Sequence, residues 1–318
     1  MDFLGKKIAI LWGSGLGDLL VMRPYFNAVF RTCRTTPLLI TTERSYSPQV
    51  INELSAKLDV CLLPSNPLKA IKRLCSLGSI DYVYYGPQNT FKSKLLSYFI
   101  PRAKSLKSKS TATFLADAIV EDAKLLNHEG HNLKPYGDRP LFRRTKSHIH
   151  MTNLKKFVLI HAATKKDWKT HSWPPEKWIS LITRLSDLEL NIILVGTRKE
   201  SHLLERIKTG IKNKNEKIFI KCDLGLAKLE EIVSRAVLAI CHNSGVMHIA
   251  VANHVPTVIL NGSSAHYWRP QYPWTQNIVG PCNKACNKYI CPDPKLNAKC
   301  IKDISVNDVF MACIELLK

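Results

Sequence analysis

Strand and helix signals alternate along almost the whole chain, and this alternation constrains the fold more than any other feature. Short apolar segments of strand length are separated by amphipathic helical stretches, and after a polar connection the pattern starts again. Strands separated by helices form parallel sheets with helices on both faces. We therefore predict an α/β protein. The expected strands cover residues 7–12, 38–41, 60–63, 82–85, 157–161, 191–195, 217–220, 237–241 and 256–260.

The length of 318 residues exceeds the usual size of one domain. Residues 127–152 are rich in His, Pro, Gly and charged residues, which is typical of a connection between domains. We therefore predict two domains of similar size, residues 1–150 and 151–318. A helix over residues 306–317 closes the chain.

The net charge of +21 favours an anionic partner such as a nucleic acid, lipid headgroups or a phosphorylated or acidic sugar. A generally solvated basic surface is the alternative. Within residues 92–109, Lys and Arg interleave with apolar residues, which indicates either a surface that touches a membrane or an anionic acceptor, or a helix with one buried face. No apolar run approaches the ~20 residues that cross a bilayer, and the first residues lack a secretion core, so we expect an unexported protein.

The first candidate site follows the first strand and opens a helix, with the sequence Gly15-Leu16-Gly17-Asp18. A dinucleotide-binding loop reads G-x-G-x-x-G, but here Asp18 takes the last position and would repel a pyrophosphate. A carboxylate at the end of such a strand suits a general base, because open α/β sheets bind ligands there. The alternative is that Asp18 only caps its helix.

Two further loops in the second half also lie between a strand and a helix. The first carries His161, Thr164 and Lys169, whose hydroxyl and ammonium donors can hold a diphosphate. The second runs from Asn243 through Ser244, Gly245 and Val246 to His248. Glycine permits close backbone approach and the first helical amides face outward, which suits an anion. The alternatives are a solvated Lys-rich loop and a structural hydrogen bond from His248.

Four of the ten cysteines are clustered near the end of the chain: Cys282, Cys286, Cys291 and Cys300. Four thiols within a short segment can surround one tetrahedral zinc or iron ion, although the spacing lacks the C-x2-C pairs of common zinc sites. Free thiols are the alternative. The surrounding segment offers little that could form a core, so a metal there would have a structural role and lie away from the reaction.

The chain resembles glycosyltransferase family 9, the lipopolysaccharide heptosyltransferases. The matching segments are 15–18, 161–164 with Trp173-Pro174, 243–250, Val255-Pro256-Thr257 and Asn261-Gly262, and they occur in the family's order across nearly the whole chain. The resemblance implies a GT-B fold: two Rossmann-like domains facing a central cleft, acceptor bound by the first and nucleotide sugar by the second. It also implies that the last helix crosses back to the first domain.

By position, the resemblance implies that Asp18 is the catalytic base, with Gly15 and Gly17 in the acceptor loop. It places Thr164, Lys169, Asn243, Ser244, Gly245, Val246 and His248 at the donor. The family usually has Asp where this chain has Asn243, and Lys where it has His171, which leaves the donor sugar open. Relatives with a four-cysteine cluster hold iron, so Cys282, Cys286, Cys291 and Cys300 are expected to bind structural zinc or iron.

The implied reaction is inverting transfer of a heptosyl group from ADP-heptose to a hydroxyl of an anionic, lipid-linked inner-core glycan. No D-x-D pair lies near the loops, so no catalytic metal is expected. Such an enzyme works in the cytoplasm, peripherally at the inner face of the bacterial inner membrane. The alternatives are a protein (Ser/Thr) heptosyltransferase, a transferase that uses another nucleotide sugar, and a basic nucleic-acid-binding protein. The last does not explain the three loops and lacks aromatic-rich recognition patterns, so no nucleic acid is expected.

Overall fold

The chain divides into two compact units, Met1–Arg143 and Arg144–Lys318. No helix within the described residues has the length and apolar character needed to cross a bilayer. A computed structural model describes residues 3–12, 15–42, 53–54, 58–86, 98–100, 102–108, 110–126, 133–143, 156–164, 169–211, 215–282, 284, 286–288 and 290–318.

The first unit contains a five-stranded sheet in the order β3-β2-β1-β4-β5, with every neighbouring pair parallel. All four side chains of β1 are buried, as expected for a parallel sheet covered on both faces. The strands are β1 (Ile8–Leu11), β2 (Leu38–Thr42), β3 (Asp59–Leu63), β4 (Tyr82–Tyr84) and β5 (Lys104–Leu106).

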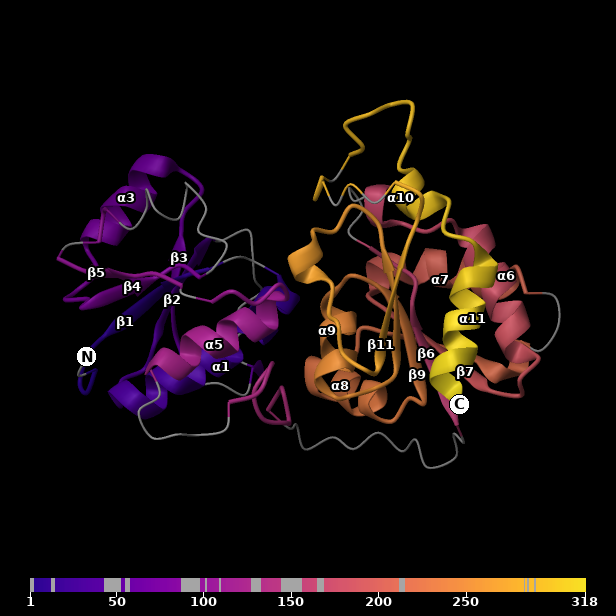
Figure 1. The fold of residues 1–318 in the computed structure, drawn as a ribbon, viewed down its shortest axis with the longest axis horizontal. Coiled ribbons are helices and arrows are strands. Elements are labelled where there is room, and N and C mark those ends of the chain that lie inside the picture. Colours follow the sequence, from indigo (N-terminus) through magenta and orange to yellow (C-terminus); the bar gives the residue numbers. More distant parts are fainter. Residues whose placement is uncertain are drawn as a thin grey trace. The chain divides into compact units, whose positions relative to one another are not determined.

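Helices cover both faces of this sheet. Helices α1 (Leu16–Cys33) and α5 (Leu115–Leu126) pack together on one face, and α3 (Pro67–Cys75) lies on the other (Figure 1). Helix α3 begins where a side-chain cap and a proline favour it, because Asn66 Oδ1 accepts a hydrogen bond of 3.1 Å from the amide of Lys69.

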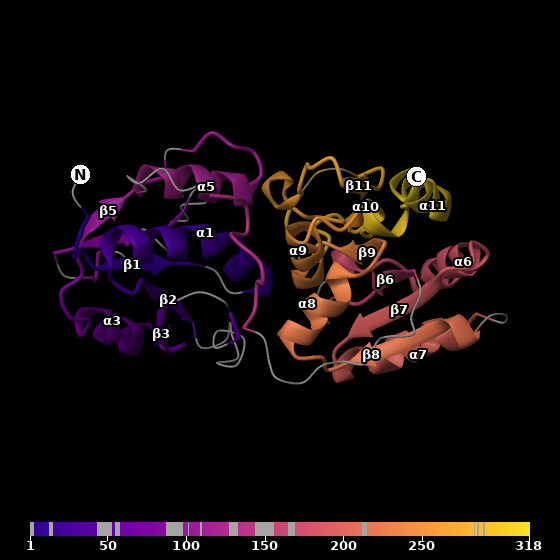
Figure 2. The same ribbon diagram turned by 90° about the horizontal axis from the view of Figure 1, so that it is seen from below.

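The second unit contains a six-stranded parallel sheet in the order β11-β10-β9-β6-β7-β8. Helices α6, α7 and α11 lie on one side of this sheet and α8 and α9 on the other (Figure 2). The strands are β6 (Phe157–His161), β7 (Asn191–Gly196), β8 (Ile218–Cys222), β9 (Leu238–His242), β10 (Thr257–Asn261) and β11 (Thr275–Val279). The helices are α6 (Pro175–Ser186), α7 (Ser201–Thr209), α8 (Leu226–Ser234), α9 (Gly245–Ala252), α10 (Lys299–Lys302) and α11 (Val306–Leu317), with short 3₁₀ turns η1 (Lys169–His171), η2 (Arg198–Glu200), η3 (Asn215–Lys217) and η4 (His266–Trp268).

The last helix packs within the second unit, and its expected return to the first domain stays a prediction. Val309, Ala312 and Cys313 of α11 are buried in one core with Trp178 and Leu181 of α6. Because these apolar side chains complete the core beneath β9, β10 and β11, the helix belongs to the second unit.

Two stretches with irregular sequence patterns also differ from expectation. The described part of residues 92–109 forms no helix: residues 104–106 are the edge strand β5, and residues 92–97, 101 and 109 lie outside the described residues. Residues 133–143, expected within the interdomain connection, belong to the first unit. The guanidinium of Arg23, 2 % exposed in α1, donates to the carbonyls of Tyr136 (2.6 Å), Asp138 (2.9 Å) and Pro140 (3.2 Å).

Candidate active site

Both sheets reverse their strand order at one point, between β1 and β4 in the first unit and between β6 and β9 in the second. At such a point the chain leaves two neighbouring strands in opposite directions and opens a crevice at their carboxyl ends, where α/β proteins bind ligands. All three sequence-predicted loops lie there: 15–18 follows β1, 161–164 follows β6, and 243–248 follows β9. The topology therefore groups the second and third loops within one unit.

The loop after β1 is held by an aromatic side chain. The Trp12 indole Nε1 donates to the backbone carbonyl of Asp18 at 2.9 Å. The Trp12 ring also lies against Gly86, just after β4, where φ is +69° and an added Cβ would lie 2.1 Å from the ring. Only glycine leaves room for this packing, so Gly86 and Trp12 together fix the start of α1.

The Asp18 carboxylate lies in the first turn of α1 and caps that turn. Its Oδ2 accepts a hydrogen bond from the amide of Gly15, the N-cap residue. An aspartate at this position also favours the positive end of the helix dipole. The residue is partly exposed. The capping interpretation of Asp18 is therefore confirmed, and it does not exclude a second role for the carboxylate as a base.

The loop after β6 presents a pair of hydroxyl groups. Thr164 Oγ1 and Ser172 Oγ are 2.5 Å apart, which joins the end of the strand to the residue after η1. Lys169 begins η1, while Lys165 and Lys166 lie outside the described residues. Ser172 was not singled out from the sequence, because a serine in a Lys-rich loop carries no pattern of its own.

His171, which stands where the family commonly has lysine, points into the protein. Its Nε2 lies 3.0 Å from Ser264 Oγ, and burial lowers its pKa to about 4. The imidazole is therefore neutral near pH 7 and supplies no positive charge to a diphosphate.

The third loop leaves the amino end of a helix without a side-chain cap. Ser244 is the N-cap of α9 but makes no capping hydrogen bond, whereas Asn66 and Ser305 cap α3 and α11. The Ser244 hydroxyl lies instead 3.3 Å from His161 Nδ1, at the end of β6. Burial lowers the pKa of His161, with the Glu200 carboxylate acting in the opposite direction. The uncapped amides at Gly245 and Val246 form a site that suits an anion.

Asn243 belongs to a chain of three asparagines across neighbouring strand ends. Its Nδ2 donates to the Trp268 carbonyl at 2.7 Å and to Asn261 Oδ1 at 3.2 Å, and Asn261 Nδ2 donates to Asn277 Oδ1 at 2.8 Å. Because a backbone carbonyl can only accept, the amide orientation of Asn243 is fixed. The Asp that the family usually has at this position could not donate these hydrogen bonds. This explains physically why Asn suits position 243 in this chain.

His248 lies one turn into α9 and is only 2 % exposed. Its ring meets Trp268 edge-on, with centroids 5.7 Å apart, and burial lowers its pKa to about 3. The side chain is neutral near pH 7 and lies beneath Trp268, in contact with the segment that also anchors Asn243.

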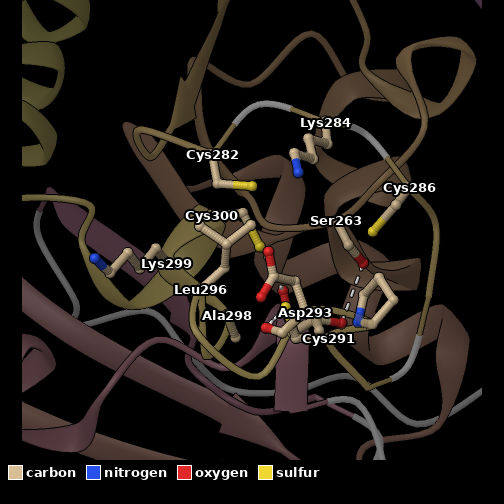
Figure 3. Close-up of a pocket in the computed structure, with 12 residues that line it drawn as sticks. Ser263, Cys282, Lys284, Cys286, Cys291, Asp293, Leu296, Ala298, Lys299 and Cys300 are labelled. Atoms are coloured by element: carbon tan, nitrogen blue, oxygen red, sulfur yellow. Dashed lines mark hydrogen bonds between the residues drawn. The ribbon is translucent and has the colours of Figure 1, made fainter.

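The four clustered cysteines line one small pocket of about 40 Å³, together with Thr170, Ser263 and Asp293. Cys282 and Cys286 approach it from opposite sides (Figure 3). Burial, together with the three neighbouring cysteines, raises the pKa of Cys300 to about 11. This volume accommodates an ion or a few water molecules but no nucleotide sugar.

The thiols of this pocket are ligands that suit zinc or iron, but their sulfur atoms do not converge on one point. In the described part of the chain, no three His, Cys, Asp or Glu side chains are grouped so that they could hold an ion. Cys291 Sγ is directed instead to the Asp293 carbonyl at 3.1 Å, and Cys300 Sγ lies 3.8 Å from the Thr170 carbonyl. The four thiols share one pocket without forming a coordination sphere.

The cysteine segment contacts the loop after β6, so it is less remote from the candidate site than the sequence suggested. The Lys288 carbonyl accepts from Thr170 Oγ1 at 2.5 Å and from Ser263 Oγ at 2.9 Å, and the amide of Asn287 donates to the Ser263 carbonyl at 2.6 Å. Gly262 permits this packing, because an added Cβ would lie 1.9 Å from the Thr170 carbonyl. Thr170 directly follows Lys169, so the cysteine segment supports η1.

Residues 109–301 match the sequence model of glycosyltransferase family 9 (heptosyltransferase). This match spans more than half of the chain. The chain belongs to glycosyltransferase family 9. It is therefore a glycosyltransferase, as the three loops indicated, and the basic nucleic-acid-binding alternative is set aside. No curated protein sequence matches the chain.

Solved structures of family 9 proteins share the fold. A family 9 glycosyltransferase from Veillonella parvula matches with a TM-score of 0.70 and 15% identity, over 100% of this chain and 98% of its own. ADP-heptose lipopolysaccharide heptosyltransferase II from E. coli matches with 0.64 and 16%, over 98% of each chain. The iron-containing dodecameric glycosyltransferase TibC from enterotoxigenic E. coli matches with 0.58 and 15%, over 99% of this chain and 77% of its own. These matches confirm the predicted GT-B type α/β fold.

Proposed function

We propose that this protein transfers a heptosyl group from ADP-heptose to a hydroxyl of an anionic, lipid-linked inner-core glycan, with inversion and without a catalytic metal. The observation that carries the donor side is the uncapped amino end of α9, at the switch point of the second sheet. Family membership supports heptosyl transfer. Similar structures include E. coli heptosyltransferase WaaC with ADP and with ADP-2-deoxy-2-fluoro heptose, which supports an ADP-sugar donor.

In this proposal the diphosphate lies against the amides of Gly245 and Val246. Thr164 and Ser172 hydrogen-bond to each other, so one hydroxyl of this pair donates to the diphosphate, and Lys169 supplies a positive charge. These groups stabilise the negative charge that develops on ADP as the bond between the anomeric carbon and the phosphate oxygen breaks. Ser244 is held by His161, and Asn243 presents its Oδ1 as an acceptor for the sugar, while His248 positions Trp268.

The acceptor hydroxyl would react in the first domain, in the loop of Gly15 and Gly17. The Asp18 carboxylate takes its proton as the oxygen attacks the anomeric carbon from the face opposite ADP. One C–O bond forms, one breaks, ADP leaves with the electron pair, and the anomeric configuration inverts. Asp18 Oδ2 accepts from the amide of Gly15, and in this proposal Oδ1 takes the proton.

The metal expected at Cys282, Cys286, Cys291 and Cys300 is proposed as structural zinc or iron. A bound ion would supply charge compensation for closely spaced thiolates and a cross-link for the segment. Support comes from the shared pocket and from the likeness to TibC, an iron-containing glycosyltransferase. Because the resemblance associates a four-cysteine iron site with protein heptosyltransferases, the same two observations favour the second candidate function, transfer to Ser or Thr of a polypeptide.

The test begins with melting temperatures in the presence of ADP, UDP and GDP, because a ligand stabilises only if it binds the native state. We expect ADP to raise the melting temperature and UDP and GDP to have little effect. Mass spectrometry then follows transfer from ADP-heptose to an inner-core acceptor and to a Ser/Thr-rich polypeptide. Stabilisation by UDP alone would indicate another nucleotide sugar, and transfer to polypeptide alone would select the second candidate.

A further inference from the structure

The most exposed large apolar side chains of the described residues lie on one face of the first unit. Tyr98 is 83 % exposed and Leu68 is 78 % exposed, the two highest values among such side chains. Leu68 lies in the first turn of α3. Ala70 and Leu74 of α3 share one buried cluster with Ile100, so α3 and the segment of Tyr98 cover the same face of the sheet (Figure 1).

Positive charge surrounds these two side chains. Residues 60–116 contain nine Lys or Arg and a single acidic residue, Asp81. Asp81 precedes β4 beside Lys104 and is already engaged, because its carboxylate lies 3.7 Å from Lys6 Nζ and accepts from the amide of Lys7 at 2.8 Å. Within the described part of residues 60–116, the exposed basic side chains are Lys69, Lys72, Arg73, Arg102, Lys104 and Lys107.

Helix α3 has two different faces, as an interfacial helix does. One side buries Ala70 and Leu74 against the sheet, and the other exposes Leu68 with Lys69, Lys72 and Arg73. Among the described residues, none of these three cations pairs with a carboxylate. A soluble polyanion would be satisfied by the cations alone, whereas exposed Leu and Tyr side chains gain free energy only where they leave water.

We propose that this α3 face, made of Leu68, Lys69, Lys72, Arg73 and Tyr98 with Arg102, Lys104 and Lys107, docks the first unit on an anionic phospholipid bilayer. Leu68 and Tyr98 enter the boundary between headgroups and acyl chains, and the cations bind lipid phosphates. This inference deepens the proposed function, since it rests on a lipid-linked acceptor.

The docking face reaches the functional edge of the first sheet through the first turn of α3, whereas Lys104, at the start of β5, lies at the opposite edge. Helix α3 follows β3, and α1 follows β1, and these parallel strands have their carboxyl ends at one edge. The first turn of α3, with Leu68, therefore lies at the same edge as Asp18. A bilayer bound there would present a lipid-linked hydroxyl on the side of the sheet that carries the candidate base.

The experiment measures co-sedimentation of the full-length protein with vesicles of phosphatidylcholine alone or mixed with phosphatidylglycerol. We expect binding to the mixed vesicles only, weakening as salt increases. Replacing Lys69, Lys72 and Arg73 with Gln should lower the partition coefficient about 5-fold per residue, about 100-fold together. The control replaces the exposed Lys199, Lys221 and Lys295 of the second unit with Gln and should change binding less than about 5-fold.

A second pair of variants tests the apolar contribution. Leu68→Ser and Tyr98→Ser should each lower vesicle binding about 10-fold, whereas Met311→Ser, at a side chain 54 % exposed in α11, should leave it unchanged. Equal losses for the α3 triple variant and its control would overturn the proposal. Unchanged vesicle binding in both Ser variants would also overturn the proposal. If the triple Gln variant then lost RNA binding, the face would be identified as a polyanion site.

Melting temperatures with ADP separate this inference from the proposed function. If ADP stabilises the wild-type protein but the protein does not bind anionic vesicles, the docking face is refuted and the donor site is supported. Vesicle binding through α3 without stabilisation by ADP would do the reverse. All variants lie at exposed positions, and unchanged circular dichroism would show that they fold.

Discussion

Asp18 combines a helix cap with a proposed base, and two substitutions can separate these roles. Asp18→Asn keeps an oxygen that accepts from the Gly15 amide but loses the basic charge, so we expect turnover to fall at least ~100-fold with an unchanged melting temperature. Asp18→Ala loses the cap as well, and should also lower the free energy of unfolding by about 1 kcal/mol. Both measurements use one preparation, with ADP binding as the control. Near-normal transfer by Asp18→Asn would show that the carboxylate only caps α1.

Asn243 offers a second prediction, because its donor role is fixed by the Trp268 carbonyl. Asn243→Asp restores the residue usual in the family but places a carboxylate against two acceptors, so we expect the free energy of unfolding in urea to fall by about 1–3 kcal/mol. The matched control is Asn307→Asp, since Asn307 Oδ1 accepts from Arg184 and a carboxylate can do the same. Equal stability of Asn243→Asp and the wild type would show that the asparagine chain reorients freely.

The loops between β6 and α9 contain several histidines whose burial links the stability of the second unit to pH. His171, His242 and His248 have pKa values of about 4, 3 and 3 against 6.5 in the unfolded chain. The unfolded chain therefore binds more protons below pH 6.5, so this stability is complete above neutral pH and is lost as the pH falls. Between pH 7.5 and 5.5 each histidine should cost about 1.4 kcal/mol of unfolding free energy.

Urea titrations at several pH values check this prediction. His171→Gln should reduce the slope of stability against pH, whatever it does to stability at pH 7.5. An identical slope in the wild type and His171→Gln would contradict the assignment of this pH dependence to the buried imidazole.

The cysteine segment is the element whose chemistry is most open to test. Elemental analysis of protein purified without a metal-binding tag should find about one zinc or iron per chain. In the folded protein, alkylation should modify the exposed Cys75 quickly and spare Cys282, Cys286, Cys291 and Cys300 until a chelator is added. Rapid alkylation of all four, with no metal found, would contradict the structural metal site.

Coupling between this segment and the donor loop follows from the hydrogen bonds to Lys288. Thr170→Val removes the hydroxyl that joins Lys288 to η1 while keeping the shape, so we expect the dissociation constant for ADP to rise about 5–10-fold. Ser180→Ala, an exposed hydroxyl on α6, is the control. Unchanged ADP binding in Thr170→Val would show that the segment supports the fold alone.

At the scale of the whole molecule, apolar periodicity was sufficient to predict most of the architecture. Residues 157–161 and 245–252 begin and end as predicted, because continuous apolar runs bounded by polar loops specify buried strands and helices. Strand β5 was missed because its Lys-Ser-Leu sequence lies at a sheet edge, where burial imposes no pattern. The return of α11 to the first domain came from the resemblance and stays a prediction, because an amphipathic helix does not encode its partner.

The candidate site was predictable only in part, for a related reason. Residues 15–18, 161–164 and 243–248 could be placed at strand ends, since a parallel sheet fixes which loops share an edge. The inward direction of His171, the Thr164–Ser172 pair and the asparagine chain could not be predicted. Such contacts join residues far apart in sequence, and a polar side chain in a loop leaves no periodic trace of the partner it bonds.

The buried Arg23 gives the molecule a mechanical property. Its guanidinium donates to the carbonyls of alternate residues in a stretch of turns and bends, which is the last described stretch of the first unit. A chain that exits a domain usually frays backwards from its exit, and tension on the linker then loosens the domain itself. Here three charge-assisted hydrogen bonds from Arg23 hold this stretch against α1. These bonds tie the last described residues of the first unit to α1, the helix that carries the Asp18 carboxylate at its amino end.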